Sequence, residues 1–177
     1  MVGPWAAAAA VMSVVTLTAG PAGAGLAPAC LLPPVVAPVL DPFREPACEW
    51  CAGNRGITYG TRAGVDVRAA AGGTVTFSGV VAGTRYVVVE HDAGGLRATY
   101  GGLTSTRLSV GDAVAAGDVV GDAAGELHFG LRRGETYVDP GPLLGRLVER
   151  ARLVPTDGTA RRAAPPARLV CPASVGR

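Results

Sequence analysis

The side chains best suited to chemistry in this chain are two histidines, four cysteines and scattered acids. Glu126 and His128 stand two residues apart in a segment with strand character, so both are expected on one face as a weak carboxylate–imidazole pair. An open zinc site needs three protein ligands and a water molecule, which this pair does not supply. His91, which follows a strand-like run and precedes Asp92, is expected to cap a loop or lie at the surface.

Other catalytic and carrier sites find no support in the sequence pattern. The serines stand in no Gly-x-Ser-x-Gly elbow, and the acids are scattered among turns rather than paired for sugar cleavage. The passage from Val110 to Gly121 has the turn rhythm of biotinyl and lipoyl carrier domains. Those domains present a modified lysine, and this chain contains no lysine, so the carrier function is excluded.

The four cysteines permit three disulfide connectivities if the chain is exported to an oxidising compartment. We expect Cys48 to pair with Cys51, and Cys30 with Cys171, the second bond tying two proline-rich tails together. Two alternatives for the Cys-x-x-Cys element remain open. A structural zinc site needs two further ligands, and a redox-active pair normally sits in a βαβ context that this sequence lacks.

The elements expected around these residues are short strands. Residues 31–46 contain five prolines and predict an extended arm rather than a helix or an inner strand. Alternating and β-branched runs predict strands over 74–78, 85–90, 96–100, 118–121, 126–131 and 135–138. After Pro142 an apolar stripe of Leu143, Leu144, Leu147, Val148 and Ala151 predicts a helix to Arg152, with a strand over 151–154 as the alternative.

Composition limits the size of the core and the class of partner. The 177 residues suit one domain with a leader and tails, and the few aromatic residues predict a small aliphatic core. The formal net charge is +2, and the arginine pairs at 132–133 and 161–162 lie in separate segments. Nucleic-acid binders concentrate basic side chains on one face, so no nucleic-acid partner is expected.

The N-terminal residues predict an export signal. An apolar run from Trp5 to Ala19 precedes a Gly-Pro break and a small-x-small cleavage site at residues 22–24. The run is shorter than the ~20 residues that span a bilayer, so no stable membrane span is expected. Pro28 fits poorly in a lipid-attachment box ending at Cys30. We therefore expect a secreted or cell-envelope protein with a signal peptide (1–24), a proline-rich arm (25–47), a β core (48–145) and a C-terminal tail (146–177).

Four motifs, taken in order, resemble the sheet core of lysostaphin-type zinc endopeptidases, which cut peptidoglycan cross-links. The motifs are Val-Arg-Ala-Ala-Ala-Gly-Gly-Thr-Val at 67–75, Arg-Tyr-Val-Val-Val-Glu-His at 85–91, Ala-Thr-Tyr at 98–100 and Leu-His-Phe at 127–129. The resemblance implies an all-β fold with a small antiparallel sheet of the barrel-sandwich hybrid type, carrying the arm and the tail.

The same resemblance assigns the family's functional positions in this chain. The metal ligands fall on Asn54, Thr58 and His128, and the two assisting histidines fall on Gly102 and Glu126. A second register would place Arg62 and Asp66 at the first two ligand positions, but it deletes the loop before the strand. In either register the first histidine is missing, and asparagine and threonine are poor zinc ligands.

The sequence therefore predicts a catalytically degenerate peptidase-like domain with no catalytic residues and no cofactor. The expected role is a noncatalytic module that binds peptidoglycan or a cell-wall hydrolase and regulates it. The alternative is an active zinc endopeptidase whose metal site is rebuilt from Asp66, His128 and a third ligand. A third hypothesis is a purely structural envelope protein stabilised by its disulfides.

Overall fold

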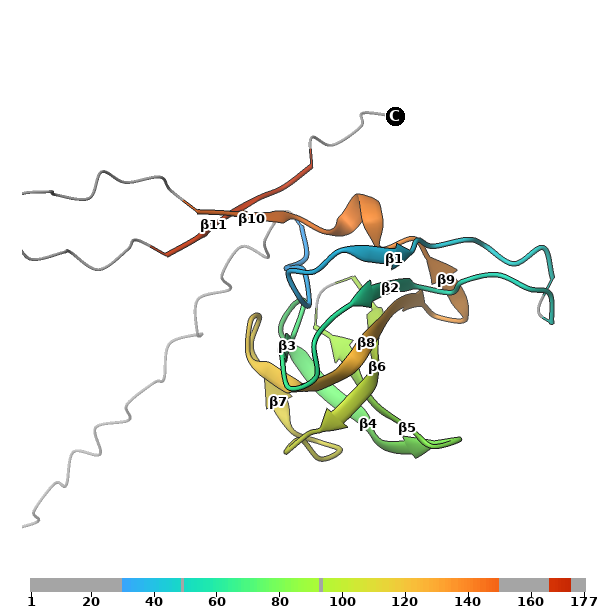
Figure 1. Ribbon diagram of the computed structural model, residues 1–177, viewed down its shortest axis with the longest axis horizontal. Helices are drawn as coiled ribbons and strands as arrows, with labels where there is room; N and C mark the ends of the chain where they lie inside the picture. The colour runs from blue at the N-terminus through green and yellow to red at the C-terminus, as the bar shows by residue number, and fades with distance from the viewer. Residues whose placement is uncertain (1–29, 49, 93, 150–165, 173–177) are drawn as a thin grey trace, which may run out of the picture.

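The computed structural model describes residues 30–48, 50–92, 94–149 and 166–172. One nine-stranded antiparallel sheet forms the body of the protein, and its main path runs β1-β2-β8-β6-β5-β4-β7. Strands β3 and β9 pair with β8 beside β2, and β10 and β11 form a separate two-stranded sheet (Figure 1). The expected all-β antiparallel class is confirmed. The elements are β1 (Val39–Asp41), β2 (Ile57–Gly60), β3 (Asp66–Arg68), β4 (Gly73–Val81), β5 (Thr84–His91), β6 (Leu96–Ser105), β7 (Ala113–Val114), β8 (Val119–Arg133), β9 (Thr136–Val138), the 3-10 turn η1 (Gly141–Leu143), β10 (Arg146–Val148) and β11 (Arg168–Val170).

The core lies on one side of the curved sheet, because alternate residues of the central strands point to the same face. It is mainly aliphatic, with one aromatic pair, Tyr100 and Phe129, whose ring centroids are 5.3 Å apart. The Tyr100 hydroxyl is fully buried and accepts a 2.8 Å hydrogen bond from the Ala70 backbone N–H. Burial raises the pKa of Tyr100, so this phenol stays neutral and fixes the loop before β4.

The prediction of two separate strands in the β8 region was wrong. Residues 118–121 and 126–131 were expected as separate strands, but β8 runs unbroken from Val119 to Arg133. Its partner β6 is also longer than the expected 96–100 and continues to Ser105. Two register shifts in the β6–β8 pairing, on either side of Leu103, let the two strands stay paired along this length.

The expected helix after Pro142 is also corrected. The chain instead forms η1, leaves it at Leu144 in an extended conformation, and continues into β10, which pairs with β11. Gly145 explains the change: a Cβ there would lie 2.6 Å from the Cys30 sulfur, and glycine is a poor helix former. The alternative strand at 151–154 lies outside the described residues.

Two disulfides join the expected pairs, Cys48 with Cys51 and Cys30 with Cys171. The second bond fastens β11 to the start of the arm, where the backbone N–H of Gly145 also donates to the Leu31 carbonyl at 2.8 Å. The C-terminal strand is therefore held to the body through the arm.

The proline-rich arm lies along the edge of the sheet. Its carbonyls at Pro34 and Pro38 accept hydrogen bonds from the backbone of Arg68 and Gly60, both at 2.9 Å. It then forms the edge strand β1 beside β2, and the segment between these two strands reaches out past β9 (Figure 1). Among the described residues, no helix has the length and apolar character needed to cross a bilayer.

Candidate functional site: the open face of the sheet

The face opposite the core carries every position that the family resemblance assigned on strands β2 and β8. In the sheet register Asp41 lies opposite Thr58, Thr58 opposite His128, and His128 opposite Gly101. Cross-strand partners point their side chains to the same face, so this row runs across the sheet. Along β8 the same face continues through Gly130 to Arg132. We call this surface the open face.

Asn54 occupies the first family ligand position, and its amide group binds the arm. Its Nδ2 donates to the backbone carbonyls of Asp41 and Pro42, at 3.0 and 3.1 Å. Its backbone N–H donates to the Arg44 carbonyl, and its carbonyl accepts a hydrogen bond from the Arg44 N–H, both at 2.9 Å. The residue is only 7% exposed. Asn54 therefore links its own end of the β1–β2 segment to the end that follows β1. Both protons of its side-chain amide are used in these hydrogen bonds.

His128 lies half-buried in the middle of the open face. Burial lowers its pKa, and the charge of Asp41 opposes this by favouring the protonated ring. A Cβ on Gly56 would lie 2.8 Å from both Cε1 and Nε2 of the imidazole, so the ring packs against the backbone of this glycine. Among the described residues, no hydrogen bond or ion pair joins His128 to Glu126, which is exposed, so the carboxylate–imidazole pair expected from the sequence is not formed.

The backbone at Gly102 admits no side chain. Its φ is +82°, and a Cβ would lie 2.3 Å from the carbonyl oxygen of Glu126. The residue sits in the β6–β8 register shift, where the chain bulges. A histidine at this family position would require the backbone of β6 or β8 to move.

The residues at the family metal positions do not fit a zinc ion. The three groups at these positions are the Asn54 amide, which is hydrogen-bonded to the arm, the Thr58 hydroxyl and the His128 imidazole. Zinc sites use thiolate, imidazole and carboxylate ligands. Over the part of the chain that the structure describes, no three His, Cys, Asp or Glu side chains gather as a metal site.

The alternative ligand Asp66 is placed far from His128, so the structure does not bring together the two ligands named for the rebuilt zinc site. Asp66 lies on β3 opposite Asp122 and forms a 2.7 Å ion pair with Arg68. His128 is six residues further along β8, about 20 Å at the rise of an extended strand. The acid that does face His128 is Asp41, which the sequence gave no reason to select because it stands in the proline-rich arm.

The surface alternative for His91 is wrong, because the residue is only 3% exposed, whereas its contact with the loop before β4 agrees with the loop-capping alternative. Its Nδ1 lies 3.2 Å from the Gly72 carbonyl oxygen. Burial lowers its pKa, and the Gly72 carbonyl and the charge of Asp92 partly oppose this. It lies on β5 away from the row that contains His128.

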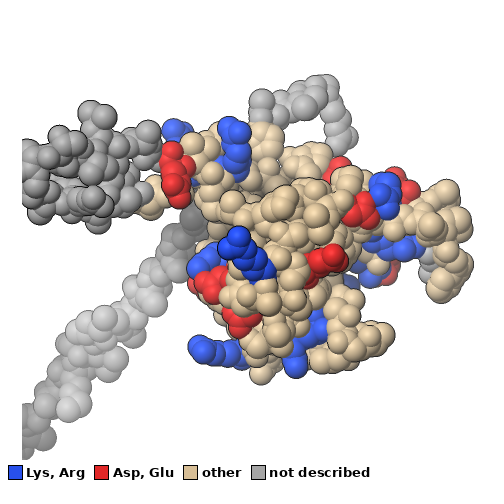
Figure 2. All heavy atoms as spheres, in the orientation of Figure 1, with Lys and Arg blue, Asp and Glu red and all other residues tan. Residues whose placement is uncertain are grey.

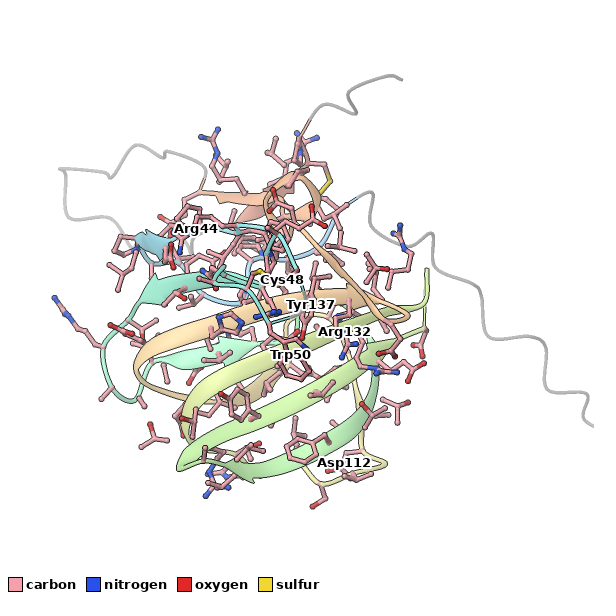
Figure 3. The ribbon with its side chains drawn as sticks, turned by 90° about the vertical axis from the view of Figure 1, so that its right-hand side faces the viewer. Arg44, Cys48, Trp50, Asp112, Arg132 and Tyr137 are labelled. Atoms are coloured by element: carbon pink, nitrogen blue, oxygen red, sulfur yellow. A yellow bond between two sulfur atoms is a disulfide. The ribbon has the colours of Figure 1, made fainter. Side chains whose placement is uncertain are left out.

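A cavity of about 900 Å³ opens at the β9 end of the open face. We call it the Trp50 pocket, and its walls come from the β1–β2 segment and the β8–β9 hairpin: Glu45, Pro46, Cys48, Trp50, Arg55, Arg132, Glu135 and Tyr137. Trp50, Arg132 and Tyr137 lie together here, with Cys48 beside them and Asp112 at the far end of the molecule (Figure 3). Motif reasoning missed this pocket because its residues come from two separate segments.

Charge is spread thinly over the molecule. On the face shown in Figure 2, blue and red side chains are scattered among neutral ones, with no broad surface of one sign. The Trp50 pocket follows this pattern, since its two arginines are matched by Glu45 and Glu135. Recognition at this site must therefore depend on local geometry rather than on long-range attraction.

Comparison with known proteins gives a consistent set of matches. The profile of "Peptidase family M23" matches residues 52–140. The chain is 33% identical over 133 residues to the uncharacterized protein Rv2891 of Mycobacterium tuberculosis, covering 68% of this chain and 53% of that protein. It is also 33% identical over 123 residues to the murein hydrolase activator EnvC of Escherichia coli, covering 64% of this chain and 28% of EnvC. The chain thus spans about half or less of these relatives.

Solved structures show the same fold. Helicobacter pylori Csd3 superposes with a TM-score of 0.57 at 25% identity, covering 65% of this chain and 34% of that one. The catalytic domain of the antimicrobial peptidase lysostaphin from Staphylococcus simulans gives a TM-score of 0.52 at 20% identity, covering 60% of this chain and 90% of that domain. The second likeness shows the fold alone, and it agrees with the lysostaphin-type sheet expected from the sequence.

Proposed function

Because this chain belongs to peptidase family M23, we propose that it acts as a noncatalytic cell-wall module, which binds peptidoglycan or a wall hydrolase through the open face of its sheet. In this proposal the chain uses no zinc and no other cofactor. It works outside the cytoplasm, after export directed by residues 1–24, a segment outside the described residues.

One observation carries the noncatalytic part of the proposal. The Asn54 amide, at the position of a family metal ligand, donates both protons to carbonyls of the arm. A hydrolytic zinc site needs three ligands and an open position for water. The geometry at Asn54 serves instead to hold the wall of the Trp50 pocket in place. In this proposal the sheet presents a binding surface where a catalytic member would hold its metal.

Two further findings support a cell-wall role. A relative that shares 33% identity over 123 residues is named a murein hydrolase activator. The chain also carries two disulfides and no free cysteine among its described residues. Disulfides persist in oxidising compartments outside the cytoplasm, where peptidoglycan and its hydrolases are found.

The test uses the full oxidised chain and purified, insoluble peptidoglycan. We expect the chain to sediment with the peptidoglycan, to release no soluble muropeptides, and to contain far less than one zinc per chain after incubation with zinc and gel filtration. Stoichiometric zinc together with muropeptide release would overturn the noncatalytic proposal and support the active endopeptidase.

The choice between direct wall binding and regulation of a hydrolase needs a second measurement. The similarity to EnvC favours a regulator, so a wall hydrolase is assayed on dye-labelled peptidoglycan with and without the chain. A change of dye release of about threefold or more at saturating chain supports the regulator. An unchanged rate with retention on peptidoglycan supports the direct binder, and a chain that does neither is the structural envelope protein.

A further inference from the structure

Two arginines face each other next to the Trp50 pocket. Arg97 on β6 lies directly opposite Arg132 on β8, and both side chains are half-buried on the open face. Like charges at directly opposed positions of a sheet destabilise it. An arrangement of this kind persists when another contribution offsets the repulsion, such as an anion bound between the two guanidinium groups.

Both arginines hold unused hydrogen-bond donors. Their Nε atoms are shielded from solvent and have no hydrogen-bond partner within the described part of the chain. The cross-strand neighbour of Arg97 on β5 is Glu90, yet among the described residues no ion pair joins the two. An unsatisfied buried donor on a charged group costs stability.

The structure already shows which kind of acceptor suits Arg132. Its guanidinium donates to the Glu135 carboxylate at 2.5 Å, although the Glu135 side chain is 85% exposed. The Arg132 guanidinium also lies over the Tyr137 ring, 4.9 Å from its centroid. Stacking on a ring fixes the plane of a guanidinium and leaves its edge for a carboxylate. Glu135 is thus a weakly held internal carboxylate that a stronger one can replace.

Trp50 supplies the other half of a peptide-binding site. Its side chain is 89% exposed, and it stands within the Cys48–Cys51 turn that is closed by a disulfide. A large apolar ring held on a short covalent loop is typical of a contact residue rather than a core residue. Trp50 lines the same cavity of about 900 Å³ as Tyr137 and Arg132.

We propose that the Trp50 pocket and the adjoining Arg97 bind the free C-terminal carboxylate of a short peptide, with Arg97 and Arg132 gripping the carboxylate and Trp50 covering the last side chain. This inference rests on the proposed function, since peptidoglycan stem peptides end in such carboxylates. A polyanion is disfavoured because Glu45 and Glu135 cancel the charge of Arg55 and Arg132 in the pocket.

The test is calorimetric titration of the full oxidised chain with acetyl-D-alanyl-D-alanine and with its C-terminal amide. We expect the acid to bind about tenfold or more tightly than the amide, in line with a charge-assisted hydrogen bond. Arg97→Gln should weaken binding of the acid by a similar factor. Glu135→Gln removes the competing carboxylate and should tighten binding severalfold, which a merely structural role does not predict.

Arg107→Gln is the matched control. Arg107 is an exposed arginine beyond the end of β6 that lies farthest from Arg97, and its loss should leave affinity unchanged. The thermal unfolding midpoint of each variant verifies folding. Equal binding of acid and amide, no binding of either, or equal displacement by inorganic phosphate overturns the inference. If the chain nevertheless sediments with peptidoglycan, the proposed function stands without it; if sedimentation also fails, both fall.

Discussion

At the scale of single residues, Asn54 shows how a family ligand position can take on a packing role. Its two amide hydrogen bonds to the arm are partly buried, and their loss leaves carbonyls at Asp41 and Pro42 without the Asn54 donor. We expect Asn54→Ala to lower the free energy of unfolding by about 1–3 kcal/mol. Urea unfolding followed by circular dichroism measures this change.

Thr58 provides the control for that substitution, since it occupies the neighbouring family position. Among the described residues its hydroxyl makes no hydrogen bond, and valine keeps its branched shape in the strand. Thr58→Val should therefore change the free energy of unfolding by less than about 0.5 kcal/mol. If Asn54→Ala lowers the free energy of unfolding as little as is expected for Thr58→Val, the amide hydrogen bonds to the arm contribute nothing to stability.

The two histidines make stability depend on pH. Burial lowers the pKa of both His91 and His128 below the ordinary value of 6.5, so the unfolded chain binds protons first as pH falls. Both rings are neutral at pH 8, and this contribution to stability is lost as pH drops through about 6.5 toward the lower pKa values of the folded state. We expect stability to decline between pH 8 and pH 5.

Comparison with the double variant His91→Gln, His128→Gln isolates the histidines from the carboxylates. Urea midpoints are measured at both pH values, and the decline should be smaller in the variant than in the wild type. A wild-type midpoint that falls no more than that of the variant would mean that the folded rings are protonated as easily as free ones. The charge of Asp41 beside His128 would then outweigh burial.

At the scale of elements, the β6–β8 bulge prevents a side chain at Gly102, the position of one assisting histidine of the family. Gly102 and Gly64 share a φ of +82°, but only at Gly102 would a Cβ strike the backbone, 2.3 Å from the Glu126 carbonyl oxygen. We expect Gly64→Ala to cost about 1 kcal/mol from backbone strain. Gly102→Ala should cost a further 1–3 kcal/mol, roughly, from the clash, measured as unfolding free energies. Equal costs would show that the bulge relaxes freely.

The strands of the central sheet were readable from the sequence because their alternation marks one buried face. Runs such as Arg85 to Glu90 have the β-branched residues that a pleated, half-buried surface selects. The continuity of β8 was not readable, because Gly121 and Gly125 resemble breaks between strands although the pairing with β6 and β3 spans them. The extended path through Gly145 into β10 was missed because the contact that requires glycine comes from Cys30, more than a hundred residues earlier.

The site was readable to the extent that it follows motifs. Asn54, Thr58 and His128 were located by counting along the chain, and the sheet register places Thr58 directly beside His128. The Trp50 pocket and the Arg97–Arg132 pair were not located, because each joins segments whose distance in space depends on the register of β6, β8 and β9. Such pairings are fixed by tertiary packing rather than by local spacing.

At the scale of the whole molecule, the arm is attached to the sheet, and the C-terminal strand is attached to the arm. The arm follows the sheet edge through backbone hydrogen bonds, and Cys30 at its start carries Cys171 and β11. The β10–β11 pair has only two strands and little buried surface, and an isolated pair of this kind is marginally stable. Among the described C-terminal residues, the Cys30–Cys171 bond is therefore the main restraint on β11.

The two disulfides should differ in how much they stabilise the fold, because they close loops of very different length. The Cys30–Cys171 bond spans 141 residues and the Cys48–Cys51 bond spans 3. The lost restriction of the unfolded chain predicts that Cys30→Ser/Cys171→Ser lowers the free energy of unfolding by about 5 kcal/mol. The same argument predicts a decrease of about 2 kcal/mol for Cys48→Ser/Cys51→Ser. Urea unfolding of each variant and of the oxidised wild type measures both losses. A smaller loss at the long-range pair would mean that the tail stays ordered near the arm in the unfolded chain, so that the bond has little freedom left to remove.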